Sequence, residues 1–264
     1  MYRAVRFSPN SVGRDRAIID AVGALLEKEG YYVSSVNEEN LTADDDAEVI
    51  LTMARSPEAL AVLKAKELEG RRVINRPDGI RACRRSTVDT LMRAYGLPAA
   101  PQDGDDGYWL KRGDEAAQCR DDVTYARNAA ERDAALARFR ERGVEDVVTT
   151  AHVKGDLVKF YGVSGTGFFM TFYPDDDGYS KFGDEKVNGR PRRYRFDADK
   201  MKSDAERLAA LTEVDVYGGD CIVRDDGSYA IIDFNDWPSF SRCKDTAAEA
   251  ITFKVKSDES TSRQ

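Results

Sequence analysis

The chain has 264 residues, of which 41% are hydrophobic and 33% are charged, and its formal net charge is −8. This length is enough for one large or two small domains with a buried core, and the composition is ordinary for a soluble globular protein. An acidic chain is not expected to be a general nucleic-acid binder, because neutralising phosphates requires a basic face. No apolar run approaches the roughly 20 residues that cross a bilayer, and the first residues contain no apolar signal region. We therefore expect a cytoplasmic protein without nucleic-acid or membrane partners.

The cysteine and histidine content narrows the chemistry further. The cysteines are Cys83, Cys119, Cys221 and Cys243; they are widely spaced and form no Cys-x-x-Cys pair, which favours buried free thiols. The single histidine, His152, excludes a multi-histidine zinc site. A hydrolase triad would have to use this histidine, and no Gly-x-Ser-x-Gly elbow accompanies it. Oxygen ligands and lysines are plentiful, and these suit magnesium and phosphate chemistry.

The first hundred residues alternate between predicted strands and helices. Strands are expected at 3–7, 31–36, 48–53 and 71–75. Helices are expected at 15–30, 57–68 and 86–95, the last of them ended by Gly96 and Pro98. This alternation predicts a small α/β unit with parallel strands and crossover helices.

Pro, Asp and Gly dominate residues 99–107, which predicts a linker between two parts of the chain. After it we expect a helix over 123–142 and strands at 108–112, 146–153, 156–163 and 167–174. The turn signal at Lys154-Gly155 predicts that the strands before and after it are antiparallel neighbours. The second half should therefore be an α+β unit.

Residues 220–235 have the pattern of a β-hairpin whose turn is Asp226-Gly227. This turn places Asp220 opposite Asp233, with Asn235 two residues further along the same face. The other face is then apolar and contains Cys221, Val223, Ala230, Ile232 and Phe234. Two facing carboxylates repel each other, so we expect a cation there, and Mg²⁺ suits three oxygen ligands of this kind. The alternative is a surface hairpin with scattered polar groups, and a bulge would shift the register by one residue.

A second feature is a cluster of arginines, formed by Arg190, Arg192, Arg193 and Arg195. It is either a solvated loop whose charges pair with nearby acidic residues, or an anion-binding loop, since the planar guanidinium suits carboxylate and phosphate. The sequence leaves both interpretations open.

The hairpin resembles the signature of the ATP-grasp superfamily, which is an acidic residue on one strand and then acidic–any–Asn on the next, followed by Pro. Here these are Asp220, Asp233, Asn235 and Pro238. The resemblance implies that the first three bind one or two Mg²⁺ ions, with Mn²⁺ as the alternative ion, which bridge the phosphates of ATP. It also implies an α/β plus α+β fold, with an N-terminal α/β domain at 1–100 and ATP-grasp subdomains at 101–149 and 150–264.

Further residues are assigned by the same resemblance. Lys111 and Lys159 are similar to strand lysines that contact the phosphates, and an arginine such as Arg193 or Arg195 would contact the acceptor phosphate. The hinge that receives adenine would be formed by Thr150, Ala151, His152 and Val153. The chain departs from the family pattern at the flap, which has only Gly113. It also departs at Gly218, where several carboxylate ligases have an arginine that stabilises the acyl phosphate.

The resemblance implies a ligase that transfers the γ-phosphoryl group of ATP to a carboxylate of a small molecule or peptide, giving an acyl phosphate that an amine or thiol attacks. One alternative is a kinase that phosphorylates a hydroxyl of a small anionic substrate, as in the inositol-phosphate kinases of the superfamily. The arginine cluster and Gly218 favour it. Another is a non-catalytic nucleotide-binding module. A homodimer is the commonest assembly of a soluble enzyme.

Overall fold

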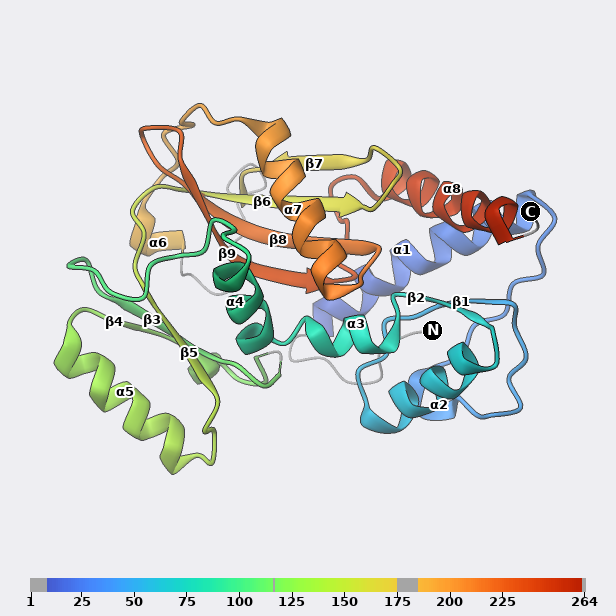
Figure 1. Cartoon of the computed structure of the whole chain (residues 1–264), viewed down its shortest axis with the longest axis horizontal. Helices are drawn as coiled ribbons and strands as arrows, with labels where there is room; N and C mark the ends of the chain where they lie inside the picture. The colour runs from blue at the N-terminus through green and yellow to red at the C-terminus, as the bar shows by residue number, and fades with distance from the viewer. Residues whose placement is uncertain (1–8, 116, 175–184, 263–264) are drawn as a thin grey trace.

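Three β-sheets organise the part of the chain that the computed structural model describes, residues 9–115, 117–174 and 185–262. One sheet has two strands, one has three in the order β4-β3-β5, and one has four in the order β7-β6-β8-β9 (Figure 1). The first is parallel and the others are antiparallel, which is the α/β plus α+β architecture that the sequence predicts. The strand expected at 3–7 lies outside the described residues.

The first part of the chain alternates helices and short strands. Its elements are α1 (Pro9–Lys28), the 3-10 helix η1 (Glu38–Asn40), β1 (Val49–Leu51), α2 (Pro57–Leu68), β2 (Arg72–Ile74), α3 (Pro77–Ala82) and α4 (Arg85–Ala94). β1 and β2 pair in parallel, with α2 as the crossover, as predicted. α2 begins where it was expected because Ser56 caps it, the Ser56 side chain accepting a hydrogen bond from the Ala59 N–H.

Two features of this part differ from the prediction. The strand expected at 31–36 is wrong, since these residues have no strand assignment. Their apolar side chains are divided between two cores, Tyr31 and Val33 packing against one and Val36 against another, so they present no common face to a sheet. α3 was not predicted, because its six residues are too few to show a helical period.

The second sheet consists of β3 (Tyr108–Arg112), β4 (Val123–Ala126) and β5 (Val147–Ala151), and α5 (Ala129–Glu141) packs beside it. The helix expected over 123–142 is wrong at its start, because the first residues of that range pair with β3 as the strand β4. Asn128 then caps α5, its side chain accepting a hydrogen bond from the Glu131 N–H.

The strands before and after Lys154-Gly155 do not form the expected hairpin. β5 pairs with β3, whereas β6 (Asp156–Val163) belongs to the four-stranded sheet. At the end of β5, the N–H of Ala151 donates to the Pro101 carbonyl and the N–H of His152 donates to the Gly107 carbonyl. These bonds occupy the backbone that a hairpin partner would need, so the turn links two sheets.

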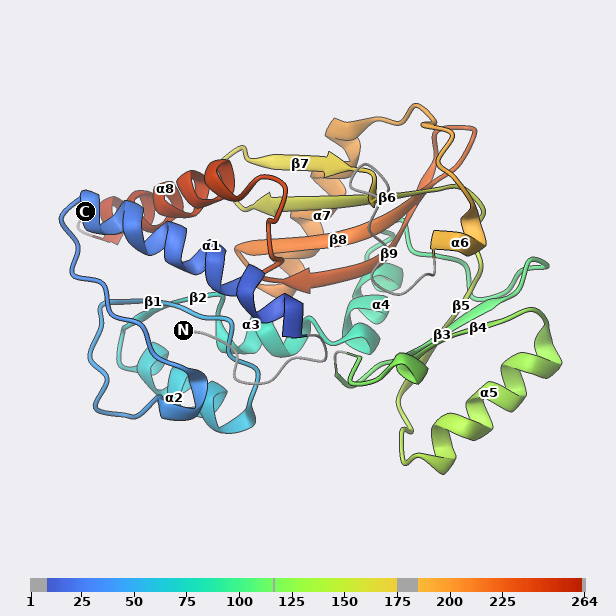
Figure 2. The same ribbon diagram turned by 180° about the vertical axis from the view of Figure 1, so that it is seen from behind.

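The four-stranded sheet contains β6, β7 (Phe169–Phe172), β8 (Val216–Val223) and β9 (Tyr229–Asp236), each antiparallel to its neighbours. α7 (Ala198–Thr212) covers one face (Figure 1), and α8 (Lys244–Ser262) lies with α1 on the other side (Figure 2). The short helices η2 (Arg120–Asp122) and α6 (Glu185–Asn188) lie in connections. The core under α7 includes Val158, Phe160, Leu208, Tyr217, Cys221, Ile231 and Phe234. The cysteines are free, and Cys119 alone among them is partly exposed.

The hairpin of β8 and β9 has the predicted centre but a different turn. Asp220 lies directly opposite Asp233, as predicted. The loop, however, is residues 225–227, because the N–H of Arg224 donates to the carbonyl of Ser228. The turn end of the hairpin is therefore one residue out of the expected register.

A β-bulge at Ile232 compensates for that shift. Cys221 pairs with Ile231, although the next pair along the strands is that of the two aspartates, so one residue of β9 has no partner. The bulge changes the face of the strand between the turn and the aspartates. Tyr229 and Ile231 enter the core under α7, and the predicted core residues Ala230 and Ile232 pack on the opposite side.

The two ends of the described chain share one hydrophobic core. Its side chains come from α1, α8, the four-stranded sheet and the loop after β9, and include Ile18, Val22, Tyr161, Val216, Trp237, Phe240, Ile251 and Val255. Asn75, fully buried after β2, adds a polar connection to β8. Its side chain accepts hydrogen bonds from the N–H groups of Asp215 and Val216 and donates one to the Val216 carbonyl. The parallel sheet is thereby fixed to β8.

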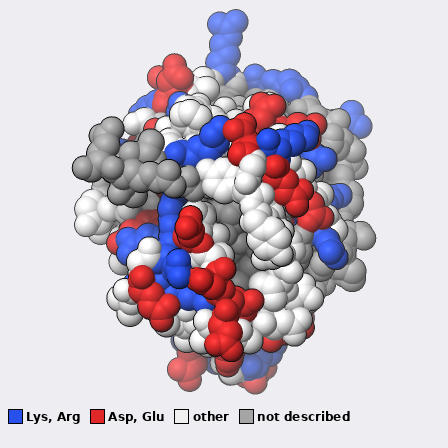
Figure 3. All heavy atoms as spheres, turned by 90° about the vertical axis from the view of Figure 1, so that its right-hand side faces the viewer, with Lys and Arg blue, Asp and Glu red and all other residues white. Residues whose placement is uncertain are grey.

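The surface carries charges of both signs. On the face shown in Figure 3, lysine and arginine side chains lie interspersed with aspartate and glutamate side chains. Within the described ranges, no helix is long and apolar enough to span a membrane.

Candidate functional site

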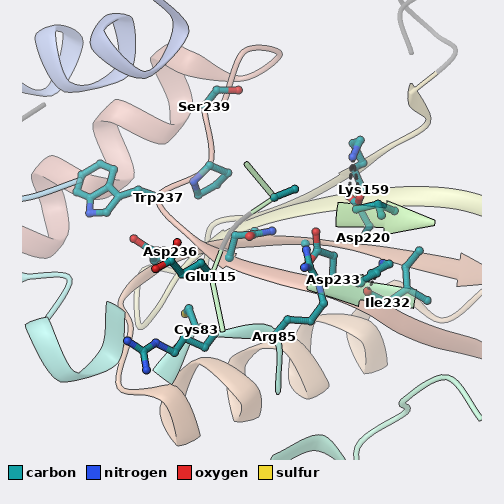
Figure 4. A pocket seen from close by; sticks show the side chains of 18 of the residues that line it. Cys83, Arg85, Glu115, Lys159, Asp220, Ile232, Asp233, Asp236, Trp237 and Ser239 are labelled. Carbon is teal, nitrogen blue, oxygen red and sulfur yellow. Dashed lines mark hydrogen bonds and ion pairs between the residues drawn. The ribbon is translucent and has the colours of Figure 1, made fainter. Parts of the chain in front are cut away.

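One face of the four-stranded sheet carries a row of side chains that can bind phosphate or metal. The register places Phe172 of β7, Lys159 of β6, Asp220 of β8 and Asp233 of β9 opposite one another. Cross-strand partners share a face, and this face is the one opposite α7 (Figure 4). Asn235 follows two residues after Asp233 on the same strand. The structure thus brings together the three oxygen ligands that the sequence predicts.

The two aspartates already have cationic neighbours. The Nζ atom of Lys159 lies 2.6 and 2.8 Å from the two carboxylate oxygens of Asp220. A guanidinium nitrogen of Arg85, the first residue of α4, lies 3.5 Å from Asp233 (Figure 4). Each aspartate side chain keeps 25% of its surface exposed, so both remain open to a ligand.

These neighbours control the ionisation of the site. Burial raises the pKa of Asp233, but neighbouring positive charges, led by those of Arg85 and Lys111, and a hydrogen bond together outweigh burial, so the pKa lies below its usual value. Burial likewise lowers the pKa of Lys159, but the carboxylate of Asp220 outweighs it and raises that pKa. The carboxylate of Asp233 and the ammonium group of Lys159 are therefore both ionised at neutral pH.

Lys111 reaches the row from the other sheet. It lies on β3, and its Nζ atom donates a hydrogen bond of 2.9 Å to the carbonyl of Ile232. Ile232 is the bulged residue of β9 and has no pairing partner on β8. The hydrogen bond to its carbonyl holds a predicted phosphate-binding lysine close to the aspartate row.

The row lies in a cleft of about 1800 Å³ between the sheets and the first part of the chain. The cleft extends from β5 to η1 and the start of α2. Residues of both antiparallel sheets, of the connection between β1 and α2 and of the loop after β9 line it, among them Arg55, Lys111, Leu157, Gly218, Trp237 and Ser239. A cleft of this size can hold a nucleotide together with a second substrate.

The predicted hinge residues also line the cleft: Thr150, Ala151, His152 and Val153. The N–H groups of Ala151 and His152 are bonded within the protein, as described above, so they are not available for adenine. The Nδ1 atom of His152 accepts a hydrogen bond of 3.0 Å from the indole of Trp109. Burial lowers the pKa of His152, which keeps the ring neutral.

The arginine cluster lies elsewhere. Arg193 stacks on the ring of Tyr173, 4.6 Å from its centroid, and Tyr173 packs against the core under α7. Arg195 lies beside the turn of the β8–β9 hairpin, its carbonyl close to Gly227. Neither side chain is among those that line the cleft. Their predicted contact with the acceptor phosphate stays a prediction without support from their position.

The sequence analysis singled out none of the six arginines that line the cleft, and three of these are Arg55, Arg85 and Arg242. Arg55 forms an ion pair with the buried carboxylate of Asp236 at the end of β9. Each of the three stands at the start of a helix or within two residues before it, and this shared position is the signal that the sequence offers. Among the described residues, no three His, Cys, Asp or Glu side chains gather around a metal-sized space, so Asn235 has to complete the oxygen set.

The architecture matches that of solved ATP-dependent ligases. The chain is similar to D-alanine–D-alanine ligase from Bacillus anthracis complexed with ATP, with a TM-score of 0.65 at 11% identity over 98% of this chain and 97% of that one. The chain has the ATP-grasp fold. The same fold is seen in D-alanyl-alanine synthetase A from Vibrio cholerae O1 biovar eltor str. N16961, with a TM-score of 0.63 at 12% identity over 88% of this chain and 86% of that one.

The ATP-grasp ligase PsnB, solved with its minimal precursor, has a TM-score of 0.56 at 14% identity over 88% of this chain and 93% of that one. No family model and no curated protein sequence matches the chain. The likeness to these ATP-grasp proteins therefore lies in the fold, and the chemistry of this cleft has to be argued from its residues.

Proposed function

We propose that the protein is an ATP- and Mg²⁺-dependent ligase that activates a carboxylate as an acyl phosphate for attack by an amine or thiol. The observation that carries this proposal is the row of Lys159, Asp220 and Asp233 on one face of a cleft. Lys111 and Arg85 converge on the same row from two other elements. Phosphoryl transfer relies on positioning and charge neutralisation, which this set of groups can supply.

The oxygen atoms of the row fit Mg²⁺. Asp220 and Asp233 face each other, are partly exposed to the cleft, and have Asn235 beside them. Carboxylate and amide oxygens are hard ligands, and few protein ligands leave room for water and phosphate oxygens. When bound, Mg²⁺ would neutralise phosphate charge and orient the transferred group. Mn²⁺ has similar ligand preferences and is the alternative ion.

The chain's own groups have separate tasks in this proposal. Lys111, Lys159 and Arg85 hold the phosphates of ATP, and the hinge residues 150–153 receive the adenine ring. An oxygen of the substrate carboxylate forms a bond to the γ-phosphorus, while the bond from that phosphorus to the β,γ-bridging oxygen breaks and its electron pair leaves with ADP. The acyl phosphate then loses inorganic phosphate when the nucleophile attacks its carbonyl carbon. The acceptor is a small-molecule or peptide carboxylate.

Two observations favour the ligase over the kinase. The similar structures are ligases or a synthetase by name, and the arginine cluster that favoured a kinase does not line the cleft. A product analysis distinguishes the two reactions. A ligase releases inorganic phosphate only when carboxylate and nucleophile are both present, whereas a kinase forms a stable phosphoester.

The first test is the thermal midpoint with ATP plus Mg²⁺, with ATP plus EDTA, and with Mg²⁺ alone. A ligand at about 100 times its Kd adds about 2.7 kcal/mol to the free energy of unfolding, which raises the midpoint by several degrees. We expect this rise in the wild type with ATP plus Mg²⁺ and its loss in Asp233→Asn.

Asp215→Asn is the matched control for that variant. Asp215 is a partly exposed carboxylate 2.9 Å from a lysine, Lys254, and it does not line the cleft. The control should keep the full Mg²⁺-dependent rise. A wild type without any rise, or an Asp233→Asn variant that retains it, would end the proposal.

A further inference from the structure

The cleft has no room for an arginine at Gly218. A Cβ atom there would lie 2.8 Å from Cγ of Pro238 and 2.9 Å from Cδ1 of Tyr161. Gly218 pairs with Asn235, in the row next to the two aspartates. The position from which several related ligases provide an acyl-phosphate arginine is therefore closed in this chain, and the charge has to come from elsewhere.

Arg242 lies on the same side of the sheet. It belongs to the loop between β9 and α8, lines the cleft, and its guanidinium lies 4.7 Å from the ring centroid of Phe172. Phe172 is the end of the row, directly beside Lys159. The Phe172 ring is also 4.9 Å from that of Tyr161, the residue that would block a side chain at Gly218. Arg242 thus lies close to Tyr161, one of the residues that leave no room for an arginine at Gly218.

The loop that carries Arg242 is held firmly. The ring of Phe240 packs 5.1 Å from that of Tyr161, and Ser239, labelled in Figure 4, belongs to the same loop. Trp237 and Phe240 adopt left-handed backbone conformations, with φ of 40° and 48°, although both are bulky and buried. Such conformations are unfavourable for bulky residues and persist where packing enforces them, commonly at active sites.

We propose that Arg242 supplies the positive charge that contacts the carboxylate undergoing activation and the phosphoryl group it receives. This inference rests on the proposed ligase reaction. The planar guanidinium can bind two oxygen atoms at once, and stacking on Phe172 fixes its plane. Its second anchor is a hydrogen bond of 3.4 Å to the Pro174 carbonyl. The loop after β9 thereby replaces β8 as the source of the arginine.

The test measures how aluminium fluoride, a mimic of the phosphoryl group in transit, binds to enzyme saturated with ADP and Mg²⁺. We expect Arg242→Leu to weaken aluminium fluoride roughly tenfold to hundredfold, the effect of one lost charge-assisted hydrogen bond. The affinity for ADP with Mg²⁺ alone should not change, because Arg242 lies at the end of the row away from Asp233. Arg242→Lys should recover part of the loss, since it keeps the charge without the planar fork.

Arg193→Leu is the matched comparison. Arg193 stacks on Tyr173, the neighbour of Phe172 in sequence, but on the other side of the sheet. We expect this variant to bind aluminium fluoride like the wild type. Equal affinities in wild type and Arg242→Leu, or a loss in Arg193→Leu instead, would overturn the inference. A wild type that does not bind ADP with Mg²⁺ would overturn the proposed function itself, which is a separate result.

Discussion

At the scale of single residues, the protonation of His152 makes the stability of the folded protein depend on pH. It is the only histidine in the chain, so its titration can be followed by itself. Its Nδ1 atom can accept the hydrogen bond from Trp109 only when that nitrogen carries no proton. Burial lowers the pKa of His152; the charge of Lys154 acts in the same direction, and that of Asp106 acts against it. The folded state therefore takes up the proton at lower pH than the unfolded chain does.

The sign of the effect on stability follows from this difference. Stability due to a neutral His152 is fully present above the unfolded pKa of about 6.5 and is lost as the pH falls through the lower folded pKa. We expect the difference in free energy of unfolding between wild type and His152→Gln to shrink as the pH decreases from about 7.5 to about 5.5. Urea unfolding at several pH values measures it. A difference that is constant with pH would contradict the prediction. As a second check, Trp109→Phe removes the hydrogen bond to the neutral ring and should raise the pKa of His152.

At the scale of elements, Asn75 joins the parallel sheet to β8. Its fully buried side chain satisfies two backbone N–H groups and one carbonyl, at Asp215 and Val216. Asn75→Ala would leave the two N–H groups without partners, and each buried unsatisfied group costs about 1–3 kcal/mol. The Val216 carbonyl would keep its hydrogen bond from the Trp237 N–H. We expect a loss of roughly 3 kcal/mol or more in the free energy of unfolding from urea titration. The control is Asn128→Ala, which removes the exposed cap of α5 and should cost about 1 kcal/mol. Equal losses in the two variants would show that Asn75 is not such a connection.

The hairpin of β8 and β9 shows which parts of a strand register can be predicted from sequence patterns. The aspartate pair was predicted correctly because two shifts of one residue, at the turn and at Ile232, cancel between the turn and Asp220. Alternation and turn residues do not mark a bulge, so the core face near the turn was wrong for Ala230 and Ile232. The turn signal at Lys154-Gly155 failed for a related reason, because a local pattern does not say which strand becomes the partner.

The same limit applies to the cleft. The three residues proposed as metal ligands, Asp220, Asp233 and Asn235, belong to two adjacent strands, so their shared face could be predicted from spacing. Arg85 and Arg242 reach the cleft only through the packing of α4 and of the loop after β9. The hydrophobic periodicity of the sequence does not predict this packing. The arginine cluster, which is conspicuous in the sequence, does not line the cleft, and Arg193 stacks on Tyr173 on the other side of the sheet.

At the scale of the whole molecule, the ends of the chain are interdependent. Ile18 and Val22 of α1 lie in one core with Trp237, Phe240 and residues of α8. α4 packs against α7 and against β5 and β9, so residues before the linker at 99–107 also contact both larger sheets. The loop that carries Arg242 lies directly on this shared core. The cleft geometry therefore depends on the first part of the chain, beyond any contact that this part makes with a substrate.

The division into segments 1–100, 101–149 and 150–264 remains a proposal, and a fragment tests its first boundary. Residues 101–264 alone would expose the shared core, because α1 and α4 would be missing. We expect this fragment to lack near-ultraviolet circular dichroism and Mg²⁺-dependent stabilisation by ATP, and co-expression of 1–100 as a separate chain should restore both. A fragment that unfolds cooperatively and responds to ATP plus Mg²⁺ on its own would make the first hundred residues an independent domain, and the dependence of the cleft on them would then be limited to substrate contacts.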